Sequence, residues 1–159
     1  MKTNLLGFPR IGANRELKKS LEKYWNGSIN AQELIQAGTI IREENWRTMQ
    51  LSGIDLIPSN DFSFYDQVLD ATLTYGCIPE RYSEIKKDKS DLDLYFAMAR
   101  GFQKDGYDVT AMEMTKWFDT NYHYIVPEFK KNQSFRLNST KVIAEYKEAL
   151  SLGIRTKPV

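Results

Sequence analysis

A helical pattern of apolar residues begins after Asn30 and continues to Gly53, with apolar positions at Leu34, Ile41, Trp46 and Met49. Apolar residues at this spacing lie on one face of an α-helix. The Asn30 side chain can cap the first turn with Glu33 as its reciprocal partner, and Gly53 favours a stop. The pattern therefore predicts a capped helix over residues 30–53.

The remaining pattern alternates between helical and strand-like stretches. Further helices are predicted at about 15–25, 64–75, 91–104 and 140–152, and strands at 5–7, 55–58, 109–114, 135–137 and 156–159. Such alternation favours an α/β fold with a parallel sheet and right-handed crossovers, either an open doubly wound sheet or part of a (β/α)-barrel. A complete barrel needs roughly 200 to 250 residues. About five strands therefore predict only the first part of one, and we expect the last strand to continue beyond Val159.

Composition narrows the class of protein. The 159 residues are 42% hydrophobic, and 22 Lys and Arg stand against 21 Asp and Glu. This length and hydrophobic content are enough to bury the core of one domain, which is predicted to span 1–159. The balanced charge argues against nucleic acid or a membrane as a partner. With one cysteine, Cys77, and one histidine, His123, neither a disulfide framework nor a structural zinc site is expected. No signal peptide or long apolar run is present, so we expect a cytoplasmic protein.

The first candidate site follows the first predicted strand, in the stretch GFPRIGANRELK at 7–18. Its glycines allow close backbone approach, Pro9 stiffens the turn, and Asn14 is the expected helix cap. Arg15 and Lys18 would then share one face of the first helical turn, where the helix dipole disfavours cations. A cationic cup for carboxylates or phosphate is one interpretation. Two solvated surface cations are the other.

The second candidate is DFSFYD at 61–66, after the predicted strand at 55–58. Asp61 or Ser63 is expected to cap the next helix, with the aromatic rings packed beneath it. Asp61 and Asp66 could also act as acid or base, although their spacing is unspecific.

The third candidate is MTKWFDTNYHY at 114–124, a dense run of aromatic residues. It would form either a wall of stacking rings with Lys116 as an anion contact, or a packed aromatic loop. His123 is expected to bridge polar and apolar surroundings rather than to act as a ligand or base. Cys77 is expected to be a small buried hydrophobic residue.

Five stretches stand out in order along the chain: LGFPRIGANRELKKSLEKYW at 6–25, REENW at 42–46, SNDFSFYDQVLD at 59–70, IPERY at 78–82 and TKWFDTNYHYIVPEF at 115–129. Together they resemble the N-terminal region of the cobalamin-independent methionine synthases. They occur in the family's order and at its spacing, and the resemblance spans the chain from Leu5 to the final predicted strand.

The resemblance implies an enzyme of two facing (β/α)-barrels that needs no cobalamin. It passes a methyl group from 5-methyltetrahydropteroyltri-L-glutamate to L-homocysteine, giving L-methionine. In that family, zinc held by His, Cys, Glu and Cys ligands in the C-terminal barrel binds homocysteine as a thiolate. A chain with one cysteine and one histidine lacks this set, so we expect the full-length protein to be an enzyme and the 159 residues alone to be inactive.

The resemblance also implies a binding role for particular residues. Arg15, Glu16, Leu17 and Lys18 fall on the family's folate-contacting segment, and Lys116 falls on a second folate-contacting position. The carboxylates of the glutamate tail would then supply the negative charge that cations at a helix N-terminus require. No residue of the chain is expected to be catalytic.

Two alternatives remain open at this point. The chain could be a non-catalytic binding module for polyglutamyl folate or another anion, or a ligand-free remnant kept for interaction. In each case the open sheet edge favours association with the missing C-terminal half or with a second copy.

Overall fold

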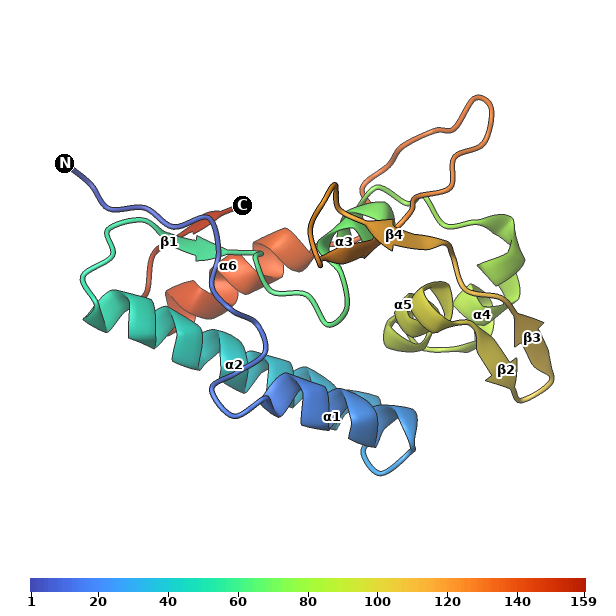
Figure 1. Ribbon diagram of the computed structural model, residues 1–159, viewed down its shortest axis with the longest axis horizontal. Helices are drawn as coiled ribbons and strands as arrows, with labels where there is room; N and C mark the ends of the chain where they lie inside the picture. The colour runs from blue at the N-terminus through green and yellow to red at the C-terminus, as the bar shows by residue number, and fades with distance from the viewer. The chain divides into compact units, whose positions relative to one another are not determined.

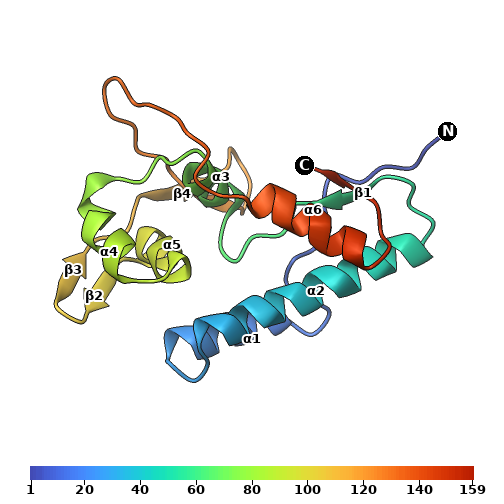
Figure 2. The same ribbon diagram turned by 180° about the vertical axis from the view of Figure 1, so that it is seen from behind.

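The computed structural model describes residues 1–159 and divides them into two compact units (Figures 1 and 2). Unit 1 consists of Met1–Phe64 and Lys141–Val159, and unit 2 consists of Tyr65–Thr140. None of the helices combines the length and hydropathy that crossing a bilayer requires.

Unit 1 contains three helices and one pair of parallel strands. Its elements are α1 (Glu16–Trp25), α2 (Ala31–Leu51), β1 (Ile57–Ser59), α6 (Lys141–Ser151) and β6 (Thr156–Pro158). β6 pairs in parallel with β1, with Ile57 opposite Thr156. An isolated parallel bridge joins Asn4 to Leu56 just before β1. The N-terminal segment, β1 and β6 therefore run in one direction, and α1 packs along α2 (Figure 1).

The core of unit 1 forms where α2 and α6 cover this strand pair. Its buried members are Trp46, Met49, Ile57, Ala149 and Ile154, with Leu5, Phe8, Ile54 and Leu152 packed against them. The indole nitrogen of Trp46 donates to the carbonyl of Pro58 at 3.0 Å, which satisfies its one donor inside the core. Gly38 is buried in the middle of α2, and a Cβ there would lie 2.8 Å from Cζ of Phe64.

A buried ion pair connects α2 to α6. The Arg42 guanidinium donates from Nε to Oε1 of Glu148 at 3.0 Å and from Nη2 to Oε2 at 2.8 Å. Nη2 also donates to the hydroxyl of Thr39, and the guanidinium lies 5.1 Å from the centre of the Phe62 ring. Only 9% of the Arg42 side chain is exposed. The planar, bidentate geometry fixes the two helices in one register.

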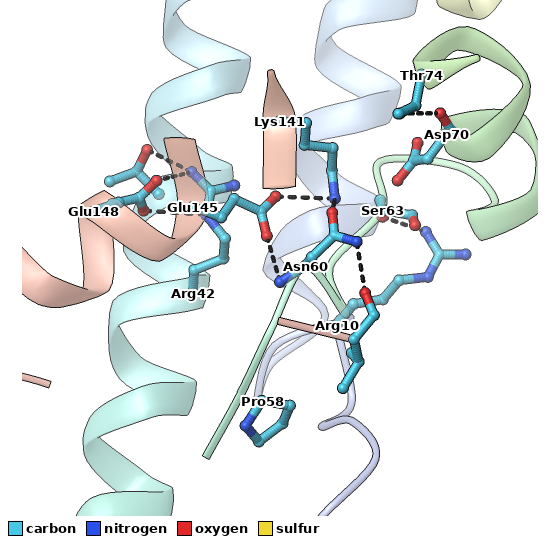
Figure 3. A network of polar contacts seen from close by, with 12 residues as sticks. Arg10, Arg42, Pro58, Asn60, Ser63, Asp70, Thr74, Lys141, Glu145 and Glu148 are labelled. Carbon is cyan, nitrogen blue, oxygen red and sulfur yellow. Dashed lines mark hydrogen bonds and ion pairs between the residues drawn. The ribbon is translucent and has the colours of Figure 1, made fainter. Parts of the chain in front are cut away.

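α6 turns a charged residue inward and leaves apolar ones outside. Glu145 is buried, whereas Ile143 and Leu150 on the same helix are exposed. Figure 3 shows the Glu145 carboxylate accepting the backbone N–H of Asn60 at 3.0 Å and pairing with Lys141 at 3.0 Å. Burial raises the pKa of the Glu145 carboxyl, while Lys141 and Arg42 act in the opposite direction.

Unit 2 is built from short helices and two hairpins. Its elements are α3 (Gln67–Thr74), the 3-10 helix η1 (Glu80–Tyr82), α4 (Ser83–Asp88), α5 (Asp91–Arg100), β2 (Phe102–Lys104), β3 (Tyr107–Val109), β4 (Met114–Lys116) and β5 (His123–Ile125). β2 pairs with β3 and β4 with β5, both antiparallel.

Asp66 connects α3 to the second hairpin of unit 2. Its buried carboxylate caps α3 by accepting the N–H of Leu69 at 2.9 Å, and it accepts the N–H of Ile125 at 3.0 Å. The hydroxyl of Tyr122 donates to the other oxygen. Three donors compensate this buried charge, as a buried carboxylate requires.

The predicted helices are confirmed. All five occur within a few residues of their expected bounds, and α2 has the capping box between Asn30 and Glu33. Gly53 and Gly153 both take positive φ values just past the ends of α2 and α6. The α/β class is confirmed as well.

The strand predictions are partly wrong. The predicted strands at 55–58 and 156–159 correspond to β1 and β6, but 135–137 forms no strand and 5–7 contributes only the adjoining Asn4 bridge. The stretch 109–114 mostly connects β3 to β4. A single parallel sheet of about five strands is therefore replaced by three two-stranded pairs, two of them antiparallel, and no barrel is closed. The short helix α4 has no counterpart among the predicted helices.

Removing the Arg42 charge tests the ion pair. Arg42→Met leaves Glu148 without its buried partner, and we expect it to lower the free energy of unfolding by about 3 kcal/mol. Arg47→Met breaks an exposed pair with Glu43 on the same helix, and we expect a change within about 0.5 kcal/mol. Urea unfolding measures both, and equal losses would contradict the assigned role of Arg42.

The raised pKa of Glu145 predicts a pH dependence of stability. The folded protein binds the Glu145 proton more tightly than the unfolded chain, in which the pKa of this carboxyl is about 4.5. The free energy of unfolding therefore falls as pH rises from about 4.5 through the higher pKa of the folded state. Glu145→Gln keeps an acceptor for the Asn60 N–H and does not titrate. Denaturant unfolding at a series of pH values should show wild type losing stability relative to this variant as pH rises. The opposite slope would refute the assignment.

Replacing Asp66 tests its role in connecting α3 to the β4–β5 hairpin. Asp66→Ala removes the acceptor of the Leu69 and Ile125 N–H groups, and we expect hydrogen exchange of α3 and β5 amides to accelerate by the equivalent of about 2 to 3 kcal/mol. Ser90→Ala removes the exposed cap of α5 and should cost about 1 kcal/mol, confined to α5. Equal protection of β5 in wild type and Asp66→Ala would show that Asp66 does not hold the hairpin.

Candidate functional site

The segment from Gly7 to Asn14 leads into α1 through a tight turn. The N–H of Arg15 donates to the carbonyl of Gly12 at 3.3 Å, and the N–H of Leu17 donates to the carbonyl of Ile11 at 3.1 Å. The Glu16 carboxylate accepts the backbone N–H of Asn14 at 2.9 Å and its side-chain amide at 3.1 Å. Backbone N–H groups of Glu16 and Asn14 lower the pKa of Glu16. Its negative charge in the first turn complements the helix dipole.

Arg15 occupies the N-cap position of α1 and is not part of its first turn. Its φ of 65° and ψ of 36° place it in the left-handed region, and it makes no side-chain capping hydrogen bond. The expectations that Asn14 caps this helix and that Arg15 lies within its first turn are therefore wrong. A left-handed non-glycine residue costs roughly 1 kcal/mol or more and concentrates at functional sites.

The four predicted contact residues differ in what they can offer a ligand. The Arg15 side chain is exposed and makes no hydrogen bond or ion pair. Lys18 is half exposed, with its ammonium 3.6 Å from the Glu22 carboxylate, a weak pair of exposed groups. Glu16 is engaged with Asn14, and Leu17 is buried in the core with 1% exposure. The two cations are thus the side chains available to an anion, and Leu17 anchors the helix that carries Lys18.

Side chains from elsewhere in unit 1 hold the backbone just before this turn. Oδ2 of Asp61 accepts the N–H of Phe8 at 2.8 Å, and the side-chain amide of Asn45 donates to the carbonyl of Pro9 at 3.2 Å. The Arg10 guanidinium donates to the carbonyl of the buried Ser63 at 2.6 Å (Figure 3). Burial raises the pKa of Asp61, while the Phe8 N–H and the Lys141 charge oppose the shift.

The second candidate stretch therefore has a role different from the predicted one. Neither Asp61 nor Ser63 caps α3, because Asp66 is the capping residue. Asp61 and Ser63 instead contact the segment that precedes α1. Of the aromatic residues, Phe62 is buried and contacts Phe64 edge to face, with ring centres 5.2 Å apart.

The third candidate stretch forms the hairpin of β4 and β5 in unit 2. Lys116 lies opposite His123 in the strand register, and its exposed ammonium makes no hydrogen bond or ion pair. Trp117 contacts Phe118 and Tyr124 edge to face, with ring centres 5.2 and 5.5 Å apart. Phe118 is 81% exposed, so the tip of the hairpin is not a fully packed loop. The prediction that Lys116 shares a ligand with Arg15 and Lys18 stays a prediction.

The chain offers no donor set for a zinc ion. No group of three or more His, Cys, Asp and Glu side chains is arranged to hold a metal. Cys77 is buried as expected, and burial raises the pKa of its thiol, which disfavours the thiolate that zinc binds. His123 is exposed, with Nδ1 3.1 Å from the carbonyl oxygen of Asn121. The residues present do not fit a zinc site.

Sequence reasoning missed several residues that organise this region. Asn45 and Glu145 are polar residues within predicted helices, and neither was expected to contact another segment. Arg10 is within the predicted GFPRIG stretch but was not given a role. The Pro9-Arg10 pair directly before Ile11-Gly12 was the one signal in the sequence that a fixed turn was present.

Comparison with known proteins gives matches along the whole chain. Residues 2–159 match the family described as "Cobalamin-independent synthase, N-terminal domain". The 5-methyltetrahydropteroyltriglutamate–homocysteine methyltransferase of Flavobacterium johnsoniae is 68% identical over 100% of this chain and 20% of its own length. Proteins of the same name from Cytophaga hutchinsonii and Saccharomyces cerevisiae are 62% and 53% identical, over 97% and 98% of this chain and 20% and 21% of their own lengths.

The chain thus spans about a fifth of the length of these relatives. The match is continuous and includes both the turn before α1 and the hairpin that carries Lys116. On this evidence the chain belongs to the cobalamin-independent synthase family, and it matches the N-terminal domain of that family.

Proposed function

We propose that the chain is the N-terminal part of a cobalamin-independent methionine synthase and that it binds the polyglutamate tail of the folate substrate. Arg15 and Lys18 at the start of α1, together with Lys116 on β4, are the proposed contacts to the tail carboxylates. The methyl donor is 5-methyltetrahydropteroyltri-L-glutamate and the acceptor is L-homocysteine, as the names of the relatives state for those proteins.

One observation supports this proposal above the others. Arg15 is in a left-handed conformation that costs free energy, and its guanidinium has no partner within the chain. A strained, exposed cation at the start of a helix is suited to a carboxylate ligand. Lys18 lies three positions further along α1 and adds a second charge.

The remaining parts of the enzyme are proposed to lie outside these residues. The zinc that binds homocysteine as a thiolate would be held by a C-terminal barrel, since this chain lacks a suitable donor set. The parallel order of the N-terminal segment, β1 and β6 supports the interpretation that unit 1 begins a (β/α)-barrel. The free thiol of Cys77 is consistent with a cytoplasmic protein.

Charge removal at the tail contacts tests the proposal. In the full-length protein, Lys18→Met and Lys116→Met should each weaken binding of 5-methyltetrahydropteroyltriglutamate by about tenfold, because each variant loses one charge-assisted contact. KM for homocysteine should stay unchanged. Lys23→Met removes an exposed cation from the other end of α1, and it should change folate binding less than about twofold.

The number of glutamates gives an independent measurement. Binding by wild type should strengthen from the mono- to the triglutamate and weaken as salt is added, because each carboxylate binds only where a cation can pair with it. Equal effects of Lys18→Met on folate and homocysteine would contradict the assignment. Absence of any binding would favour a ligand-free interaction domain.

A further inference from the structure

The partly buried carboxylate of Asp61 holds the backbone just before the Arg15 turn. Phe8, Pro9 and Arg10 lie outside any helix or strand, so side chains rather than a ladder of backbone hydrogen bonds fix them. Asp61 accepts the Phe8 N–H at 2.8 Å from the stretch that follows β1. A Cβ on Gly7 would lie 3.4 Å from Cβ of Asp61, so the Asp61 side chain packs closely against the backbone at Gly7.

The charge of Asp61 strengthens this contact. A hydrogen bond to an ionised acceptor is roughly twice as strong as one between neutral groups, and Asp61 is partly buried, where screening by water is weaker. Asn45 on α2 is a second anchor, through the carbonyl of Pro9 at 3.2 Å. The segment is thus held from both sides just before the turn that sets the direction of Arg15.

We propose that Asp61, assisted by Asn45, is a positioning residue that sets the preference of this site for substrates with several glutamates. Asp61 does not touch the tail itself. By fixing Phe8, it fixes the turn from Ile11 to Arg15 and the start of α1, and so places the Arg15 and Lys18 charges for successive carboxylates. The inference rests on the proposed function, because it takes those two cations to be the tail contacts.

The chain supplies a matched control for Asp61. Asp55, just before β1, also accepts a backbone N–H from the N-terminal segment, that of Thr3 at 2.7 Å. Thr3 lies on the far side of the Asn4 bridge from Gly7, away from the turn. Asp55→Ala therefore removes the same type of hydrogen bond without releasing the segment that leads to Arg15.

The experiment measures the dissociation constants of the full-length protein for 5-methyltetrahydropteroyl monoglutamate and triglutamate. The readout is the ratio of the two constants, which a general loss of folded protein does not change. Asp61→Ala should lower the preference for the triglutamate by about tenfold, whereas Asp61→Asn, which keeps an acceptor for the Phe8 N–H, should retain most of it. Asp55→Ala should leave the ratio at the wild-type value.

Lys18→Met in the same series separates the two proposals. A lowered ratio in Lys18→Met with a wild-type ratio in Asp61→Ala would overturn the positioning role and leave the proposed function standing. An unchanged ratio in Lys18→Met would overturn the proposed function and this inference with it. If Asp61→Ala does not fold, Asn45→Ala decides, because it removes an exposed contact to the same segment: a lowered ratio supports the inference, and an unchanged ratio overturns it.

Discussion

Two helices of unit 1 that are far apart in the sequence, α2 and α6, meet at the ion pair between Arg42 and Glu148. β1 and β6, which these helices cover, are only three residues long, and their backbone pairing alone cannot hold the helices in place. The guanidinium is committed to Glu148, Thr39 and the Phe62 ring, so it can neither leave the core nor be replaced by a point charge of the same sign. β6 directly follows α6 in the chain, so this contact also helps to hold β6 beside β1.

The same arrangement brings together the groups at the carboxyl ends of the parallel strands. Asn60 directly follows β1, and its N–H and side-chain oxygen are held by Glu145 and Lys141 of α6. The next residue, Asp61, contacts the segment that leads to α1. A chain of hydrogen bonds therefore runs from α6 through the end of β1 to the turn that carries Arg15. Function in parallel α/β folds is concentrated at this end of the strands, and Asn60 and Asp61 lie there in unit 1.

The helices could be predicted from the sequence because each combines a 3.6-residue pattern with a local end signal, such as the capping box of Asn30 and Glu33. The strands could be predicted only in part, because three-residue strands are too short for a period-2 pattern. β1 and β6 correspond to predicted strands, whereas β2 and β5 lie outside every predicted strand. Leu137 illustrates the error, since its segment is apolar in sequence but the side chain is exposed. The segment of the candidate site was predictable from its glycines and proline. The left-handed Arg15 and the contact from Asp61 depend on tertiary structure that no local pattern encodes.

Gly38 carries a consequence for how this protein can be altered. Replacing a glycine inside a helix by alanine is a common route to a more stable protein, because the unfolded chain loses freedom and helix propensity rises by about 1 kcal/mol. At Gly38 the added methyl group would lie 2.8 Å from Cζ of Phe64, so the Phe64 ring would have to move before alanine could fit. The gain in helix propensity is therefore offset by a change in packing, and position 38 is a poor choice for that route to stability.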